Sequence, residues 1–135
     1  MIVNCLSCKP LPVYGRGANV RDWLYVGDHA DAIWAILQRG KKGQTYDIGG
    51  KTELSNIEML HLLIALLAEE AKEDPNAYRA LVRFVDDRPG HDFRYAIDSS
   101  KIEKELGWRP KTALKEGLKK TIKWYLSKKS LLSDV

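Results

Sequence analysis

Cysteine is scarce in this sequence, with only two residues in 135, and both lie in one short segment. Cys5 and Cys8 form a C-x-x-C pair, but a structural zinc site needs about four ligands, and no second pair exists. The three histidines show no metal-ligand spacing with this pair, which also lacks the strand-then-helix context of a thioredoxin-like redox motif. We therefore predict no metal site and interpret the two cysteines as buried or incidental thiols.

Long apolar runs are also missing from the sequence. No stretch approaches the roughly 20 residues that a membrane-spanning helix requires, so we expect no membrane partner. The apolar start, Met1–Cys8, is short and has no basic leader or obvious cleavage site, which speaks against a secretory signal. We expect a cytoplasmic globular protein with a single domain over residues 1–135, a length sufficient for its own hydrophobic core.

Charge of one sign does not dominate, because 22 lysines and arginines face 18 acidic residues, for a net charge of +4. The basic excess lies mostly in the last quarter of the sequence, at Lys111, Lys115, Lys119, Lys120, Lys123, Lys128 and Lys129. A solvated helix face accounts for such a run. Aromatic residues do not interleave with the basic ones as in surfaces that bind nucleic acid, so we predict no nucleic-acid partner.

Motifs that carry catalysis or bind a dinucleotide are absent as well. The sequence has no G-x-G-x-x-G, no P-loop and no nucleophile elbow, and Gly15-Arg16-Gly17 lacks the third glycine. The segment Tyr125–Lys129 satisfies Y-x-x-x-K, but Tyr125 falls on the apolar stripe of a predicted helix, which favours core packing. We therefore predict no catalytic and no cofactor-binding residue in this chain.

The pattern of apolar and turn-forming residues predicts an α/β arrangement of short strands and three to five helices. Extended segments are expected at 9–15, 20–26, 45–48, 82–85 and 94–97. Helices are expected to begin at an Asp28 cap, a capping box of Ser55 and Glu58, a Ser100 cap and a Thr112 cap, and glycines end the first and third of them. Residues 69–76 are polar and contain a proline, which predicts a mobile surface loop. Residues 129–135 are expected to fray.

Four side chains are suited to an anionic ligand that also carries an aromatic ring. Arg21 lies in an extended segment and Arg88 precedes a Pro-Gly-His turn, and the planar guanidinium pairs with phosphate oxygens through two parallel bonds. Tyr14 can stack on a base, and Asn56 lies at a predicted helix amino terminus, where anions are favoured. Each residue also has a structural interpretation: surface ion pairs for the arginines, core packing for Tyr14 and helix-start chemistry for Asn56.

In order along the chain, a series of motifs resembles the extended short-chain dehydrogenase/reductase family, and most closely its dTDP-glucose 4,6-dehydratases. The matching segments are K-P-L-P-V-Y-G (9–15), N-V-R-D-W-L-Y-V-x-D-H (19–29), Y-D-I-G-G (46–50), S-N-I-E (55–58), D-R-P-G-H-D-x-R-Y-A-I-D (87–98), K-I-x-x-E-L-G-W-x-P (101–110) and E-G-L-x-K-T-I-x-W-Y (116–125). The R-D-W-L-Y-V and D-R-P-G-H motifs are specific, whereas L-G-W-x-P is shared across the superfamily.

The resemblance implies a binding site for the nucleotide and diphosphate of a dTDP-sugar. In such dehydratases this site is lined by the P-x-Y segment, the arginine of R-D-W, the asparagine after the serine cap and the D-R-P-G-H turn. The implied substrate-binding residues are Pro12, Val13, Tyr14, Arg21, Asn56, Asp87, Arg88, Pro89, Gly90 and His91. Tyr14, Arg21, Asn56 and Arg88 are also the residues that the side-chain chemistry alone favours.

The resemblance covers only the carboxy-terminal, substrate-binding portion of the family, so no complete Rossmann domain is expected. The family uses NAD to oxidise the sugar at C4, removes water across C5 and C6 and returns the hydride to C6, and its cofactor and catalytic residues lie in an amino-terminal region. We therefore expect no cofactor in this chain and no activity from it alone. Alternatives are a portion of a UDP- or GDP-sugar epimerase or dehydratase, or an interaction module that kept the fold.

Four apolar residues lie in segments that, by the same resemblance, pack onto the cofactor domain. They are Ile33, Trp34, Leu37 and Ile48. Exposed apolar patches drive association. We therefore expect self-association through this surface, or its burial against a separate amino-terminal NAD-binding partner.

Overall fold

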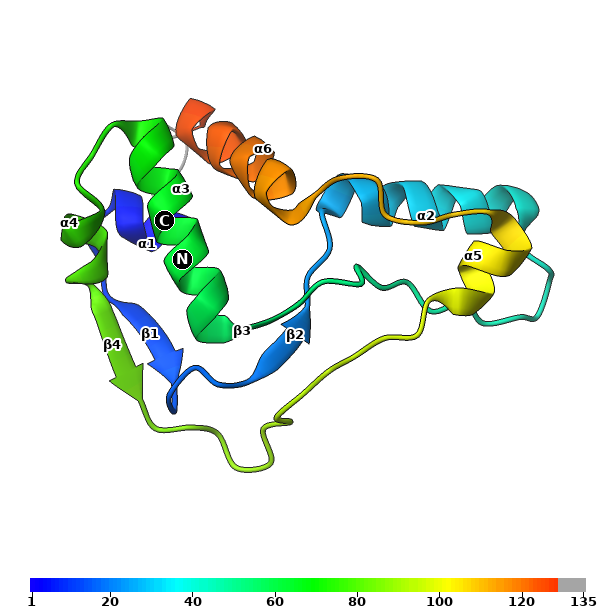
Figure 1. Cartoon of the computed structure of the whole chain (residues 1–135), viewed down its shortest axis with the longest axis horizontal. Coiled ribbons are helices and arrows are strands. Elements are labelled where there is room, and N and C mark those ends of the chain that lie inside the picture. The colour runs from blue at the N-terminus through cyan, green and yellow to red at the C-terminus, as the bar shows by residue number, and fades with distance from the viewer. Residues whose placement is uncertain (129–135) are drawn as a thin grey trace. The chain divides into compact units, whose positions relative to one another are not determined.

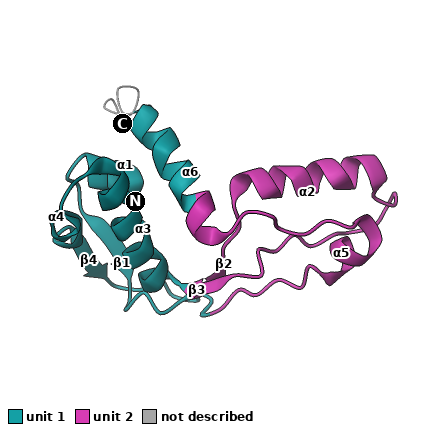
Figure 2. Ribbon diagram, turned by 45° about the horizontal axis from the view of Figure 1, so that its top comes forward, with its two compact units in different colours: residues 1–19, 55–93, 118–135 teal, residues 20–54, 94–117 magenta. Residues whose placement is uncertain are grey.

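A computed structural model describes residues 1–128, which divide into two compact units (Figures 1 and 2). Unit 1 comprises residues 1–19, 55–93 and the described chain from 118 onward, and unit 2 comprises residues 20–54 and 94–117. The described residues form six helices and four short strands, where the sequence predicted three to five helices. The segment 129–135, predicted to fray, lies outside the described residues.

The sheet of unit 1 is a parallel pair of β1 (Leu11–Tyr14) and β4 (Val82–Val85) (Figure 1). Leu11 pairs with Val82 and Tyr14 with Val85. Successive side chains of a strand point to opposite faces, so Leu11 and Val13 enter the core while Tyr14 is exposed. Both extended segments predicted from the sequence are therefore confirmed.

The core of unit 1 is built around α3 (Asn56–Ala71). The helix begins with the predicted capping box. The Ser55 hydroxyl accepts a hydrogen bond from the Glu58 backbone nitrogen, and the Glu58 carboxylate accepts one from the Ser55 backbone nitrogen. Apolar residues at helical spacing, including Ile64 and Leu67, are fully buried on one face. This face packs with β1, α1 (Ile2–Leu6) and α6 (Leu114–Ser127).

Helix α6 places its predicted apolar stripe against this core. Ile122 is fully buried, and Leu118 and Tyr125 pack partly buried beside it. The core-packing interpretation of Tyr125 is thereby confirmed, while Lys129, the other member of its Y-x-x-x-K match, lies outside the described residues.

The surface loop predicted for residues 69–76 is wrong. Helix α3 continues to Ala71 and ends at Lys72 in the left-handed conformation, and α4 (Pro75–Arg79) follows almost at once. Asp74 caps α4 by accepting from the Asn76 nitrogen at 2.9 Å, and a proline at the first helical position favours a helix start. The segment is polar because Glu69 lies on an exposed helix face, where it pairs with Lys119 at 2.7 Å.

Unit 2 pairs β2 (Val20–Asp22) with β3 (Glu53–Ser55), and Val20 also bridges in parallel to Arg94. Its helices are α2 (Val26–Arg39) and α5 (Ser100–Leu106). The small core between them contains Ala32, Ala35, Ile102, Leu106 and Trp108. The predicted strand over 20–26 is thus too long, because Val26 already begins α2.

Asp28 does not cap α2 as the sequence predicted. It lies in the first turn of the helix, is buried, and accepts hydrogen bonds from the Lys111 nitrogen (3.1 Å), the Thr112 nitrogen (2.8 Å) and the Thr112 hydroxyl (3.0 Å). Burial alone would raise the pKa of Asp28, but the bonds from Thr112 and Lys111 hold it below its ordinary value. The Thr112 side chain, predicted to cap α6, therefore serves Asp28 instead.

Two further predictions in unit 2 are corrected. The segment 45–48 is not a strand. Tyr46 and Ile48 pack against the core of unit 2, and the Tyr46 hydroxyl donates to Glu105 at 2.9 Å. Ser100 is the first residue of α5 rather than its cap, and Asp98 accepts from its nitrogen at 2.9 Å. The predicted end of α5 at Gly107 is confirmed, with φ of 65°.

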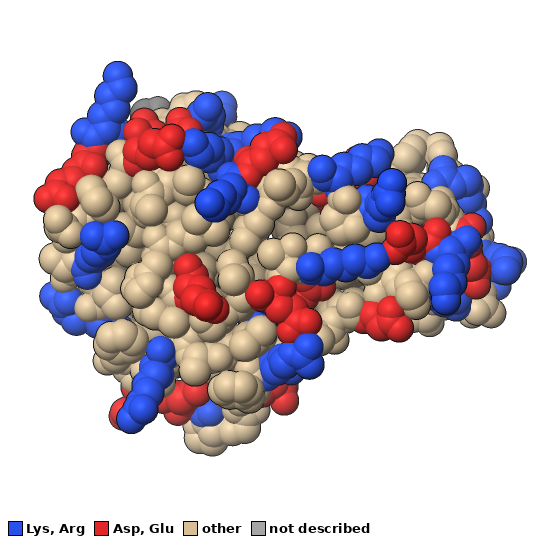
Figure 3. All heavy atoms as spheres, viewed as in Figure 1, with Lys and Arg blue, Asp and Glu red and all other residues tan. Residues whose placement is uncertain are grey.

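The described surface carries both signs of charge. On the face shown in Figure 3, basic side chains lie interspersed with acidic ones in both units. Within residues 1–128, no three or more Cys, His, Asp or Glu side chains gather where a metal ion could bind. Cys5 is buried and Cys8 exposed, both as free thiols. None of the described helices is long and apolar enough to cross a membrane.

Candidate nucleotide-binding site

The parallel pairing of β1 with β4 brings Tyr14 to the turn that follows β4. Carboxyl ends of parallel strands lie at the same edge of a sheet, and Tyr14 is in register with Val85. The Gly15 nitrogen extends this pairing by donating to the Val85 carbonyl at 2.8 Å. The D-R-P-G-H turn, residues 87–91, therefore begins beside Tyr14, although the two segments are far apart in sequence.

The Tyr14 ring contacts two basic side chains of this turn. The Arg88 guanidinium carbon lies 5.2 Å from the ring centroid, and the His91 ring meets the Tyr14 ring edge-on, with centroids 6.1 Å apart. Tyr14 is 43% exposed, so the interpretation as a core aromatic is wrong. We call Tyr14, Asp87, Arg88 and His91 the Tyr14–Arg88 site.

The Asp87 carboxylate forms hydrogen bonds with two residues of its own turn. Its Oδ1 lies 2.6 Å from His91 Nδ1 and accepts from the Arg88 backbone nitrogen at 2.8 Å. The hydrogen bond with His91 is the main reason that the pKa of Asp87 lies below its ordinary value, and the Arg88 backbone bond adds to it. Gly90, with φ of 70°, lets the chain reverse, and the His91 nitrogen donates to the Arg88 carbonyl at 3.2 Å.

The glycines after β1 are used for packing rather than for binding a dinucleotide. Gly17 has φ of 69°, and a Cβ there would stand 2.8 Å from Val13 Cγ1 and 2.9 Å from Ile57 Cβ. Its nitrogen donates to the Tyr14 carbonyl and its carbonyl accepts from the Ile57 nitrogen, each at 2.9 Å. A dinucleotide cradle needs a helix to open directly after the glycines. The next helix starts only at Val26, so these residues do not fit NAD.

The other predicted residues of unit 1 have different placements. Asn56 is the first residue of α3, half-buried, and its backbone nitrogen donates to the Asn19 carbonyl at 2.9 Å. Pro12 is exposed on β1, and Pro89 and Gly90 are exposed in the turn. Val13 is buried in the core, so only its backbone is available to a ligand.

Arg21 belongs to unit 2, unlike the other predicted residues. It lies in β2, donates to the Val20 carbonyl at 2.7 Å, and its guanidinium carbon stands 4.7 Å from the centroid of the Tyr95 ring. Both arginines of the predicted site are thus stacked on a tyrosine, each within its own unit.

Asn19 is a residue of this region that the sequence did not single out. It is only 5% exposed, and its side chain reaches the turn after β4. The sequence signal was its place in the N-V-R-D-W motif, but nothing in the local pattern predicts that a polar residue after a glycine turn is buried.

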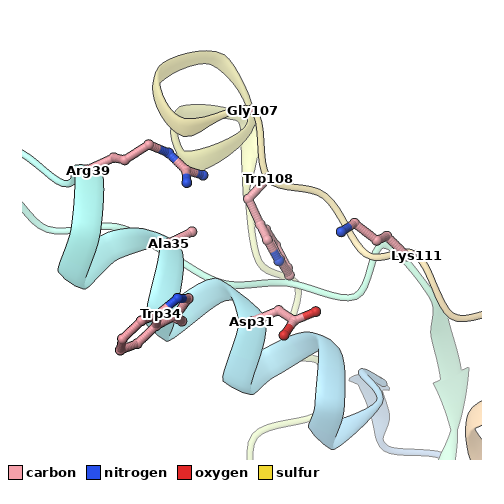
Figure 4. A pocket seen from close by; sticks show the side chains of 7 residues that line it. All are labelled: Asp31, Trp34, Ala35, Arg39, Gly107, Trp108 and Lys111. Carbon is pink, nitrogen blue, oxygen red and sulfur yellow. The ribbon is translucent and has the colours of Figure 1, made fainter.

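Unit 2 contains a separate hollow of about 290 Å³ (Figure 4). Its lining residues are Asp31, Trp34, Ala35, Arg39, Gly107, Trp108 and Lys111. Arg39 and Lys111 extend toward Trp108 from opposite sides, and Arg39 donates to the Leu106 carbonyl at 3.0 Å. None of the residues predicted to bind the nucleotide lines this hollow.

Solved structures of nucleotide-sugar dehydratases and epimerases have the same fold. DesIV, a dTDP-glucose 4,6-dehydratase of Streptomyces venezuelae with NAD and TYD bound, matches with a TM-score of 0.83 and 39% identity over 98% of this chain and 39% of its own. UDP-glucose 4-epimerase of Thermotoga maritima, with UDP-glucose, matches with a TM-score of 0.80 and 25% identity over 96% of this chain and 38% of its own. The predicted fold class is confirmed.

The chain belongs to the GDP-mannose 4,6 dehydratase family, whose model matches residues 1–121. The dTDP-glucose 4,6-dehydratase of Neisseria gonorrhoeae is 51% identical over 133 residues, which are 96% of this chain and 38% of that protein. The resemblance to dTDP-glucose 4,6-dehydratases is thereby confirmed. The chain spans less than two fifths of the length of each of these relatives.

Proposed function

We propose that this chain is the substrate-binding part of a dTDP-glucose 4,6-dehydratase, which converts dTDP-glucose to dTDP-4-keto-6-deoxyglucose, and that unit 1 binds the nucleotide end of that substrate. The observation that carries the proposal is the Arg88 guanidinium stacked 5.2 Å from the centroid of the exposed Tyr14 ring. In this proposal the guanidinium binds diphosphate oxygens and the tyrosine ring packs against the nucleoside.

The Asp87 carboxylate does not engage the Arg88 guanidinium, so the Arg88 side chain is available to an anion. Asp87 uses its carboxylate for His91 and for the Arg88 backbone nitrogen. Among the described residues, no carboxylate forms an ion pair with the guanidinium, so the surface ion pair considered from the sequence is not formed there. A stacked guanidinium loses less side-chain freedom when it binds phosphate, which favours binding.

We assign no step of the reaction to residues of this chain. Gly15 and Gly17 do not form a dinucleotide cradle, and the sequence predicts no catalytic residue in this chain. NAD, which DesIV binds, would supply the hydride chemistry from another part of a longer protein. The role left to this chain is to hold the substrate by its nucleotide. In unit 1 this role falls to the Tyr14–Arg88 site together with Pro12, Val13, Asn56 and the rest of the turn, and in unit 2 Arg21 is a separate candidate for binding an anion.

Calorimetric titration of the purified chain with dTDP, UDP and GDP tests this proposal. We expect dTDP to bind with the highest affinity of the three. Preference for UDP or GDP would contradict the dTDP assignment and favour the corresponding sugar-nucleotide epimerase or dehydratase. Absence of heat with every nucleotide, in a chain shown to be folded by circular dichroism, would contradict nucleotide binding and favour an interaction module.

We also propose that the outer face of α2 is an association surface. Val26, Ile33 and Leu37 follow helical spacing, with Trp34 beside them, so they share one face. All four are exposed, and Leu37 reaches 73% and Trp34 61%. Ile48, by contrast, is half-buried against the core of unit 2, so its predicted exposure is wrong. Contiguous apolar surface of this kind favours contact with a second copy.

The association is expected to weaken when a charge is placed in this face. In sedimentation velocity over a range of concentrations, the unmodified chain should form larger species as concentration rises, and Leu37→Glu should remain monomeric. Gln38→Glu adds the same charge at an exposed position beside the face and should behave as the unmodified chain. A strictly monomeric unmodified chain at the highest concentration would exclude self-association and favour cover by a separate amino-terminal NAD-binding partner.

A further inference from the structure

Asn19 connects the two segments that frame the Tyr14–Arg88 site. Its backbone carbonyl accepts from the Asn56 nitrogen at 2.9 Å, at the first residue of α3. Its side-chain nitrogen lies 3.3 Å from the Asp92 carbonyl and 3.4 Å from His91 Nδ1, residues at the end of the turn. At 5% exposure, Asn19 is one of the few buried polar residues of the described chain.

The geometry around His91 determines what the Asn19 amide can do. His91 Nδ1 is 2.6 Å from Asp87 Oδ1, and a carboxylate can only accept, so Nδ1 carries a proton and donates it to Asp87. A protonated Nδ1 has no lone pair to offer to the Asn19 amide. The Asn19 nitrogen therefore donates to the Asp92 carbonyl, and its contact with the imidazole edge is one of packing.

Asp87 and Asn19 thus both contact the His91 ring, whose side chain is only 8% exposed. Asp87 accepts the Nδ1 proton, and Asn19 donates to the Asp92 backbone and lies against the edge of the imidazole ring. His91 in turn packs against the Tyr14 ring, on which Arg88 stacks. Loss of the Asn19 amide would release the carboxyl end of the turn without removing any of the proposed ligand-binding side chains.

We propose that Asn19 is a positioning residue of the Tyr14–Arg88 site, which orders His91 and the end of the turn before a nucleotide binds. The inference deepens the proposed function and rests on it for the ligand, but the ordering of His91 is a property of the free chain. Asn19 itself is not expected to touch the nucleotide.

The matched experiment compares Asn19→Ala with Asn4→Ala. Asn4 also donates through its side chain to a backbone carbonyl of unit 1, that of Pro10 at 2.7 Å, away from the turn. In Asn19→Ala we expect altered imidazole ¹⁵N shifts of His91 in the free chain and about fivefold to tenfold weaker dTDP binding, the effect of one lost hydrogen bond. In Asn4→Ala the His91 shifts and the dTDP affinity should equal those of the unmodified chain. The His91 signals are assigned by their loss in His91→Gln.

The two readouts separate the positioning role from the proposed function. If the unmodified chain binds no dTDP but Asn19→Ala still changes the His91 signals, nucleotide binding fails and the positioning of His91 stands. If the His91 signals of Asn19→Ala match those of the unmodified chain, the positioning role is overturned, whether or not dTDP binds. Asn19→Gln keeps the amide donor and should restore part of the dTDP affinity. If Asn19→Gln binds dTDP no more tightly than Asn19→Ala does, that result would also count against the proposal.

Discussion

Replacing Arg88 with alanine is expected to weaken dTDP binding by about tenfold to a hundredfold. Hydrogen bonds to a charged group contribute about 1.5–3 kcal/mol, and each 1.4 kcal/mol corresponds to a factor of about ten in affinity. Since Arg88 is exposed and its guanidinium stacks on Tyr14 outside the core, the free energy of unfolding should change little. Calorimetric titration and thermal unfolding of the same preparations measure the two quantities.

Arg83→Ala is the matched control for Arg88→Ala. Arg83 is an exposed arginine of β4 in the same unit, and its guanidinium donates to the Ala80 and Val82 carbonyls at 2.7 Å each. The Arg83→Ala substitution removes the same charge as Arg88→Ala but leaves the turn unchanged, so the dTDP affinity should hardly change. Arg88→Lys keeps the charge but loses the planar fork, and we expect intermediate affinity. Equal losses in Arg83→Ala and Arg88→Ala would show that only net charge attracts the nucleotide and would contradict a specific site.

Gly17→Ala is expected to be the more damaging of two glycine substitutions made at nearly the same backbone geometry. Gly17 has φ of 69° and Gly90 φ of 70°, so alanine meets the same left-handed conformation at both, at a cost of roughly 1–2 kcal/mol. At Gly17 the new methyl group also collides with Val13 and Ile57, and overpacking of this kind adds about 1–3 kcal/mol. At Gly90 nothing lies within 4 Å.

Urea unfolding of the two variants separates these contributions. The difference in the free energy of unfolding between Gly17→Ala and Gly90→Ala reports the collision alone, because the backbone cost is shared. Gly17→Ala should also weaken dTDP binding, since Gly17 joins Tyr14 to the start of α3 through both of its backbone hydrogen bonds. If the two variants were equally stable, the contact of Gly17 with Val13 and Ile57 would not constrain the turn.

Local sequence signals predicted those parts of the fold that depend on neighbouring residues. The capping box of Ser55 and Glu58 needs only four consecutive residues, and the left-handed end of α5 needs only a glycine after an apolar helix face. Tyr14 and Arg88 were chosen for their chemistry, and the structure brings them together. Their mutual contact was not predicted, because it depends on the parallel register of two distant strands.

The predictions that failed concern residues whose partners are distant in the sequence. Asp28 resembles a helix cap in its own segment, but its carboxylate is engaged by Thr112, 84 residues away. Asn19 looks like an ordinary turn residue, but its side chain is buried against residues 72 and 73 positions later. Residues 69–76 were predicted to form a loop because they are polar. The partner of Glu69 is Lys119, on a helix 50 residues further on, so the sequence around Glu69 does not show that this polar residue belongs to a helix. A window of local sequence contains none of these partners.

The interleaving of the two units along the chain has a consequence for how the protein is made. Unit 1 gains β4 and α6 only after the first part of unit 2 has been synthesised, so β1 leaves the ribosome long before its parallel partner exists. Chains emerge from the amino terminus at about 5–20 residues per second, and contacts distant in sequence form late. Until then, β1 has no partner strand. The Tyr14–Arg88 site is therefore assembled late in biogenesis, although Tyr14 is the first of its residues to be translated.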